Sequence, residues 1–429
     1  MNPDRKRLLF IIIIGVFFFL RIFHLEESVN FSTDQSLGML ETYHLYQAKK
    51  LTLIGQTGSS WTEEGRYIFF GSLPYYIYMP VLYLANWQPL SISYLFIFLQ
   101  FISLIILYRT ITRVLKDWKL AIFFSFIFSL LPVVVEHSNY LWAPNLLIPL
   151  SVILIALVIK FMKAKHHRFI LSGLTGLVGG IGFYIHPSFI LAVGIVFGWV
   201  AFRRKWNLAS LLFFIGGLVL GISPLIMFDL RHDFYNIRTV LFIFSESPQG
   251  AHSSAAKFNP HYLFPVIPFV LYAFSVVLKK IQQVNRFIVP VIFTGLGIYS
   301  FLTVLSVPSH GFGMPEGWNY PGVRKAEKII LSENVNDFNL IDLLTGDVRA
   351  TSLRYLLIID HKPPKTVDEY PDTQRLFIYS RLPVEEILKG NLWEIDVIRP
   401  VKFVKQWDIQ NGVRLYLVER TKEPDTNSK

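Results

Sequence analysis

The amino-acid sequence predicts an α-helical polytopic membrane domain followed by a small α/β domain outside the cytoplasm. Three observations support this fold class. Hydrophobic residues make up 52% of the 429 residues, charged residues only 17%, and the mean hydropathy is +0.44. The apolar residues form runs of about 20, which is the length that a helix needs to cross the hydrocarbon core of a bilayer. The lysines and arginines lie in short clusters between these runs.

Charge and motifs exclude several classes of protein. The net charge of +11 does not indicate nucleic-acid binding, because the basic residues lie between apolar runs and not along one face of a domain. The absence of cysteine excludes disulfides, thiolate catalysis and cysteine-based metal sites. The sequence also has no HExxH zinc motif, P-loop or dinucleotide fingerprint, so zinc hydrolysis and cytosolic nucleotide chemistry have no support.

Nine apolar runs are predicted to span the membrane. The first, residues 8–25, follows a basic cluster and is expected to stay uncleaved, because no cleavage site of small residues follows it. The other eight cover residues 91–109, 119–136, 144–162, 169–185, 188–202, 207–228, 260–279 and 286–307. A tenth apolar stretch, residues 71–85, is rich in tyrosine and contains Pro74 and Pro80, so the question is whether it spans.

The basic clusters decide the direction of the spans, since short cytoplasmic loops collect Lys and Arg. If residues 71–85 do not cross, every cluster falls on the side of the N-terminus, namely at residues 109–119, 160–168, 203–205 and 279–286. We therefore predict a multi-pass protein of the plasma membrane with a cytoplasmic N-terminus. Residues 71–85 are predicted to form an interfacial helix on the outer side.

This topology predicts two domains. Residues 1–307 form the membrane domain, and residues 308–429 form an extracytoplasmic α/β domain in which charged residues return. The second domain is entered through a linker at residues 308–315, and short β-like runs predict its strands. These runs cover residues 338–343, 355–359, 375–379 and 413–418.

Polar residues at the outer helix ends are candidates for a site, because ionisable groups near a bilayer are costly. Asp34 follows the first span and precedes an amphipathic helical pattern. Its carboxylate can act as a general base, or it can cap the helix, which is the commoner role. Glu64, Arg66, Tyr75 and Tyr76 lie farther along the same outer loop. Arg66 can bind a phosphate or be an ordinary solvated charge.

Three other outer segments add candidates for substrate binding. The turn after the third span contains His137, which can face a substrate or simply the water at the interface, and Asn145, which can bind substrate hydroxyls. His186 precedes a proline, a pattern more typical of a structural helix end.

The segment after the seventh span contains Asp229, Arg231, His232 and Arg238. Two arginines and Lys257 on the outer side go against the inside bias of basic residues. They favour a ligand that carries a phosphate.

The order of these motifs resembles the GT-C class of membrane glycosyltransferases, in particular bacterial relatives of dolichyl-phosphate-mannose protein mannosyltransferases and of aminoarabinose transferases. The resemblance covers roughly residues 5–260 and begins with Asp34 in the first outer loop. The other motifs are Gly-x-x-Pro-Tyr-Tyr at 71–76, Ser-x-Tyr-x-x-x-Pro-Asn at 138–145 and Ser-Pro-Leu-Ile-Met-Phe-Asp-Leu-Arg-His at 223–232.

This resemblance implies transfer of a sugar from a polyprenyl-phosphate donor to a lipid, glycan or protein acceptor at the outer face, with inversion of the anomeric centre. Asp34 occupies the position of the family's catalytic carboxylate, which deprotonates the acceptor. A polyprenyl tail partitions into lipid, so basic groups for its phosphate belong at the interface. Arg66, Arg231 and Arg238 are the candidates for that task.

Two residues depart from the family's pattern. Gln35 stands where relatives have a second acidic residue, and Asn145 stands where many have one. Fewer carboxylates weaken the case for a divalent metal, which prefers hard oxygen ligands, so no cofactor is predicted. The departures also leave open an inactive or divergent member of the class.

Two other function classes compete with a transferase. A transporter or lipid flippase predicts ionisable residues in the middle of its spans, whereas the span centres of this sequence are almost free of charge. A non-catalytic assembly or scaffold protein would tolerate the loss of Asp34.

Overall fold

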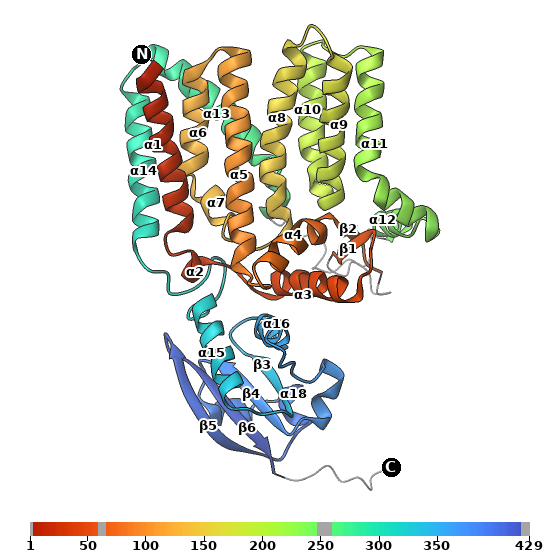
Figure 1. Cartoon of the computed structure of the whole chain (residues 1–429), viewed down its shortest axis with the longest axis vertical. Helices are drawn as coiled ribbons and strands as arrows, with labels where there is room; N and C mark the ends of the chain where they lie inside the picture. The colour runs from red at the N-terminus through yellow and green to blue at the C-terminus, as the bar shows by residue number, and fades with distance from the viewer. Residues whose placement is uncertain (1–2, 59–65, 247–259, 422–429) are drawn as a thin grey trace.

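The computed structural model describes residues 3–58, 66–246 and 260–421. In this part of the chain, long apolar helices form a bundle, and a small α/β domain lies beyond one end of it (Figure 1). The predicted fold class, a polytopic helical domain followed by an α/β domain, is therefore confirmed.

Each of the nine predicted spans corresponds to a helix among the described residues. These helices are α1 (Pro3–Ile22), α5 (Leu90–Thr110), α6 (Trp118–Leu130), α8 (Leu147–Lys163), α9 (Arg168–Ile185), α10 (Ile190–Phe202), α11 (Leu208–Arg231), α13 (Ile267–Val284) and α14 (Ile288–Leu305). One-turn helices extend three of them: η1 (Ile111–Leu115) follows α5, while η2 (Ala143–Leu146) and η3 (Pro187–Phe189) precede α8 and α10. Six of the resulting segments are long and apolar enough to cross a membrane.

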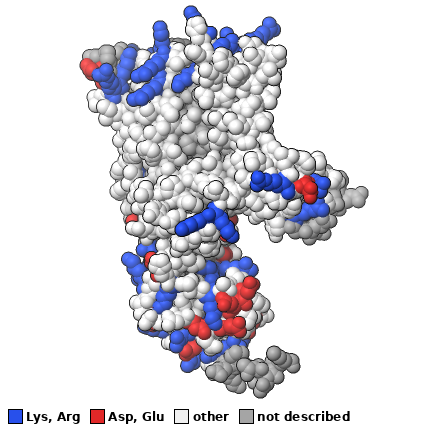
Figure 2. Space-filling model, turned by 45° about the vertical axis from the view of Figure 1, so that its right-hand side comes forward, with Lys and Arg blue, Asp and Glu red and all other residues white. Residues whose placement is uncertain are grey.

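The two ends of the bundle differ in charge. Figure 2 shows Lys and Arg side chains gathered at the end that is farthest from the C-terminal domain, and an almost uncharged surface below them. The start of α1 and the connections α5–α6, α8–α9, α10–α11 and α13–α14 all lie at this end (Figure 1). The basic clusters of the sequence therefore share one end of the bundle.

Helices α9 and α11 pack closely through glycine. A Cβ atom at Gly176 or Gly180 of α9 would overlap the backbone of Phe214 or Leu218 of α11. Contacts between small residues let two backbones approach in a bilayer, where dispersion contacts replace the hydrophobic effect.

Short elements form a layer at the other end of the bundle (Figure 1). They are α2 (Leu25–Ser28), α3 (Thr33–Ala48), β1 (Ile54–Thr57), β2 (Phe69–Gly71), α4 (Leu73–Leu84), α7 (Pro132–Glu136), α12 (Tyr235–Glu246) and η4 (Pro260–Leu263). With 12 residues, α4 is about 18 Å long and cannot cross a hydrocarbon core of about 30 Å. It packs on α3 in this layer, as expected of an interfacial helix.

The C-terminal domain is built on a four-stranded sheet in the order β3-β4-β6-β5. Strands β3 (Phe338–Asp342) and β4 (Arg375–Ser380) are parallel, and β5 (Val401–Gln410) and β6 (Val413–Arg420) complete the sheet with antiparallel pairings. The remaining elements are α15 (Tyr320–Ser332), α16 (Thr351–Ile359), η5 (Val367–Asp372), α17 (Val384–Lys389) and α18 (Trp393–Asp396).

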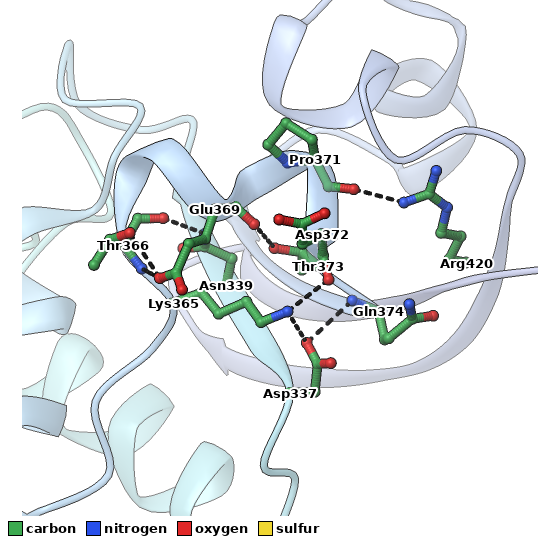
Figure 3. Close-up of polar contacts among 10 residues, drawn as sticks. All are labelled: Asp337, Asn339, Lys365, Thr366, Glu369, Pro371, Asp372, Thr373, Gln374 and Arg420. Carbon is green, nitrogen blue, oxygen red and sulfur yellow. Dashed lines mark hydrogen bonds and ion pairs between the residues drawn. The ribbon is translucent and has the colours of Figure 1, made fainter. Parts of the chain in front are cut away.

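Polar contacts hold η5 on this sheet (Figure 3). The Nζ atom of Lys365 lies 2.9 Å from Oδ1 of Asp337, and Glu369 accepts hydrogen bonds from the backbone and hydroxyl groups of Thr366. These contacts fix the segment that leads from α16 into β4.

The prediction of a strand at residues 355–359 is wrong, because these residues form the second half of α16. All side chains from Ser352 to Leu357 are buried, and α16 packs against both α3 and α15. A helix that is covered on several sides has no polar face, so its short apolar run resembles a buried strand.

The C-terminal domain docks directly on the segment that leads into α3. Phe31 is fully buried, and its ring centroid lies 5.5 Å from that of Tyr355 and 6.0 Å from that of Tyr320. The hydroxyl group of Tyr355 donates a hydrogen bond of 2.8 Å to the carbonyl oxygen of Trp87, just after α4.

The backbone of Asn30 joins three segments. Its amide donates to the carbonyl oxygen of Asn139 (3.1 Å), and its own carbonyl oxygen accepts from Leu141 (3.4 Å). Its side-chain amide donates to the carbonyl oxygen of Phe312 (2.7 Å) in the linker to the C-terminal domain. The entrance to α3, the turn after α7 and this linker therefore meet at one residue.

Candidate functional site

A cavity of about 1110 Å³ opens at the end of the bundle that carries the C-terminal domain. Its lining comes from α3, the β1–β2 hairpin, α4, the turn between α7 and α8, the α9–α10 connection and the residues around η4. A concave site lined by aromatic rings and a few polar groups is typical of ligand binding.

Asp34 lines this cavity and is not the cap of α3. The N-cap is Ser32, whose amide (3.1 Å) and hydroxyl (2.5 Å) donate hydrogen bonds to Oε1 of Gln35. Gln35, a departure from the family's pattern, thus completes the helix cap. The side-chain amide of Gln56 donates to the backbone carbonyl of Asp34 (2.8 Å) and fixes the first turn of α3.

Asp34 lines the open cavity and keeps an exposed side chain. Burial raises the pKa of Asp34, and the negative charge of Asp347 in the C-terminal domain raises it further. Among the described residues that line the cavity, none is Lys or Arg. A carboxylate with a raised pKa is a stronger base once it is ionised.

A second carboxylate, that of Glu41, lines the same cavity. Glu41 follows Asp34 by seven residues, two helical turns, so both lie on one face of α3. Gly38 lies between them, and a Cβ atom there would stand 3.1 Å from Nε2 of Gln56. Glu41 is not among the residues predicted from the sequence, although its spacing from Asp34 predicts a shared helix face.

Three histidines from separate segments line the cavity, namely His137, His186 and His261. The rings of His186 and His261 are 5.4 Å apart, and the ring of Phe264 lies 4.1 Å from that of His137. Burial lowers the pKa of His137 to about 4, of His186 to about 3 and of His261 to about 4, and the charge of His261 contributes to the first two. The imidazoles are therefore neutral near pH 7.

Four of the residues selected from the sequence thus line the cavity: Asp34, Tyr75, His137 and His186. Tyr76 has a structural role, since its hydroxyl donates to the carbonyl oxygen of Thr52 (2.8 Å). Asn145 is buried behind the cavity wall, where its amide donates to the carbonyl oxygen of Tyr140.

The candidates at the end of α11 and in α12 are not in the cavity lining. Asp229 accepts a hydrogen bond of 2.8 Å from the amide of Asn236 at the start of α12. His232 pairs with the carbonyl oxygen of Phe228, and Arg231 and Arg238 are exposed.

The remaining charged candidates belong to the first outer loop and to the segment before η4. The guanidinium group of Arg66 lies 4.5 Å from the ring of Phe242 and does not line the cavity, although its neighbour Tyr67 does. Glu64 and Lys257 lie outside the described residues. Within the described residues, no group of three or more His, Asp and Glu side chains is arranged to hold a metal ion.

Several wall residues were not selected from the sequence. Trp142 and His261 have rings 4.5 Å apart, and Tyr140 lies close enough to Asp34 for that charge to raise the pKa of Tyr140, after burial. Phe312 reaches the wall from the linker. Trp142 and Tyr140 fall within the 138–145 motif, but nothing in the sequence links His261 or Phe312 to it.

No protein-family model matches the sequence, and no curated protein matches it. A solved structure does match: the crystal structure of ArnT from Cupriavidus metallidurans bound to undecaprenyl phosphate. The TM-score is 0.57 at 10% sequence identity, and the match covers 97% of this chain and 98% of that chain. The shared architecture therefore includes both the helical bundle and the C-terminal domain.

Proposed function

Because the chain has the membrane GT-C fold, we propose that it transfers a sugar from a polyprenyl-phosphate donor to a lipid, glycan or protein acceptor. The observation that carries this proposal is the carboxylate of Asp34, which faces a cavity of about 1110 Å³ at the end of an apolar bundle. The solved structure with the same fold binds undecaprenyl phosphate. In this proposal the cavity lies at the outer face of the plasma membrane and the basic end of the bundle is cytoplasmic.

Asp34 is the general base of the proposed reaction. It takes the proton of the acceptor hydroxyl or amine, and the acceptor atom attacks the anomeric carbon of the sugar. The bond from that carbon to the phosphate oxygen breaks, polyprenyl phosphate leaves with the electron pair, and the anomeric centre is inverted. A pKa raised by burial suits the carboxylate to this task. The proposed reaction requires no metal cofactor.

The donor has an apolar part and a charged part. Its polyprenyl chain would lie in the lipid against the bundle, and its phosphate would enter the cavity. We retain Arg66 as the candidate for the phosphate, because its neighbour Tyr67 lines the cavity. Arg231 and Arg238 are exposed and do not line the cavity. They can contact the phosphate only if the donor reaches beyond the cavity.

Transfer is tested with purified protein in lipid vesicles and undecaprenyl-phosphate sugars labelled in the sugar. We expect the label to move to the acceptor or to water while undecaprenyl phosphate is released, and we expect Asp34→Asn to abolish this. Asp368→Asn, in η5 of the C-terminal domain, is the control. Full transfer by the Asp34→Asn protein would remove the catalytic role of Asp34.

The same vesicles separate a transferase from a flippase. A flippase moves the labelled lipid across the membrane without breaking its sugar–phosphate bond, and a scaffold protein does neither. Movement of the intact lipid without release of undecaprenyl phosphate would contradict the proposed function.

A further inference from the structure

Three polar side chains line the part of the cavity between α3 and α4, namely Glu41, Tyr75 and Tyr78. The hydroxyl group of Tyr78 is buried without a hydrogen-bond partner among the described residues, and the carboxylate of Glu41 is exposed. Glu41 comes from α3, and the tyrosines lie three residues apart on α4, so that they share one face of that helix.

Tyr78 is the strongest sign of a ligand. Its side chain is only 3% exposed, and its hydroxyl oxygen is buried without a partner in the described part of the chain. A buried hydroxyl without a hydrogen bond is costly, so buried polar groups are nearly always paired. The ring packs against Phe96 at 5.9 Å and is held firmly in place.

Tyr75 links Tyr78 to the acidic wall of the cavity. It is 7% exposed, and burial together with the charge of Glu41 raises its pKa. The hydroxyl of Tyr75 is therefore a donor close to a carboxylate acceptor. A donor and an acceptor side by side match a sugar hydroxyl, which can both accept and donate.

The distance between the two carboxylates sets the size of the group that fits. Seven residues of α-helix separate Asp34 from Glu41 by about 10 Å along the axis of α3. Gly38 leaves the surface between them without a side chain, and the amide of Gln56 passes over it. The cavity beside this face of α3, with a volume of about 1110 Å³, is large enough for a sugar ring with its substituents.

We propose that Glu41, Tyr75 and Tyr78 form a subsite for the hydroxyl or amino substituents of a sugar ring whose reacting atom lies at Asp34. The subsite rests on the proposed function and deepens it, because it assigns the residues that select the sugar. The ring belongs either to the donor or to a saccharide acceptor, and the chemistry of recognition is the same for both.

Binding measurements in detergent separate these two sources. The probes are undecaprenyl phosphate and its glucosyl and aminoglucosyl derivatives, titrated into Glu41→Gln, Tyr75→Phe and Tyr78→Phe. Tyr83→Phe is the matched control, since Tyr83 lies on the same helix but is 54% exposed and outside the cavity lining. Thermal midpoints of all variants check that they fold.

If the subsite holds the donor sugar, Glu41→Gln weakens binding of a glycosylated probe about tenfold, as expected for a lost hydrogen bond to a charged group, and leaves undecaprenyl phosphate unaffected. If it holds an acceptor sugar, lipid binding is unchanged and the KM for a saccharide acceptor rises with little change in kcat. Either result supports the subsite.

Two results would overturn it. One is that all three variants bind every probe and use the acceptor like the control. The other is that they lose affinity for undecaprenyl phosphate and its glycosylated forms equally, which indicates damage to the phosphate region. A protein that prefers the glycosylated probes but never transfers the sugar would retain the subsite and refute the proposed function, so the two failures are distinct.

Discussion

The guanidinium group of Arg21 donates a hydrogen bond of 3.0 Å to the carbonyl oxygen of Ser129. A second bond, of 3.2 Å, reaches the carbonyl oxygen of Phe128, whose regular helical donor would be the amide that Pro132 lacks. Arg21 is fully buried in α1 and also bonds to Gln100 of α5. Arg21 therefore caps the C-terminal end of α6, where Pro132 interrupts the helix. Helix α7 and the turn that lines the cavity follow this interruption.

Replacement of Arg21 is expected to destabilise the bundle. Arg21→Met leaves two buried carbonyl groups without donors, at about 1–3 kcal/mol each, so the loss is about 2–6 kcal/mol. Thermal unfolding in detergent measures it, with Arg231→Met as the control because Arg231 is exposed. Equal unfolding temperatures for the two variants would contradict the capping role.

Contact between α9 and α11 depends on the absence of side chains. Gly180→Ala places a methyl group on the backbone of Leu218 and is expected to cost about 1–3 kcal/mol through overpacking. Gly194→Ala on α10 is the matched control, since no described atom lies within 4 Å of the added carbon. The unfolding midpoint of the first variant should fall while that of the control stays; a fall in both would assign the effect to glycine in general.

The charge of Asp347 should be visible in the pH dependence of transfer. In the proposed reaction ionised Asp34 is the active form, so the rate is expected to rise with pH through the pKa of Asp34. Asp347 raises that pKa, and Asp347→Asn is therefore expected to move the acidic limb of the kcat/KM profile to lower pH. Asparagine can still accept the hydrogen bond that Asp347 takes from the amide of Thr351 (2.8 Å), which preserves the start of α16.

Asp368→Asn in η5 serves as the control for this profile, because the raised pKa of Asp34 comes from burial and from the charge of Asp347, and not from Asp368. An acidic limb that stays in place in the Asp347→Asn protein would show that the C-terminal domain does not act on the base.

Docking of the C-terminal domain is expected to depend on Tyr355. Tyr355→Phe removes its bond to the carbonyl oxygen of Trp87 and weakens the interface by about 1 kcal/mol. Hydrogen exchange should then become faster in the amides of α3. The control is Tyr416→Phe, which removes a similar bond of 2.9 Å to Leu382 inside the domain. If α3 exchanged equally fast in both variants, the bond to Trp87 would have no role in docking.

The membrane helices could be predicted from the sequence because lipid imposes apolar side chains over the length of each span, and because basic clusters mark their ends. The break in the third predicted span is also readable, since Pro132 removes a helix hydrogen bond. Residues 355–359 were misread for the opposite reason: α16 is covered by α3 and α15, so its pattern lost the polar face that identifies a helix.

The cavity was only partly predictable. Asp34 could be predicted because an ionisable group beside a membrane is costly and is therefore usually functional. Glu41 could have been predicted from its helical spacing from Asp34. His261 and Phe312 could not, because tertiary packing alone brings their segments to the cavity. Arg231 at the end of α11 and Arg238 in α12 have the right charge for a phosphate, but both side chains are exposed and lie outside the cavity lining.

Asn30 has a mechanical consequence for the molecule. The side-chain amide of Asn30 donates a hydrogen bond to the carbonyl oxygen of Phe312, whose side chain lines the cavity. The backbone of Asn30 is hydrogen-bonded to the backbones of Asn139 and Leu141. A displacement of the C-terminal domain that moves the linker would therefore also move Phe312 and change the shape of the cavity wall.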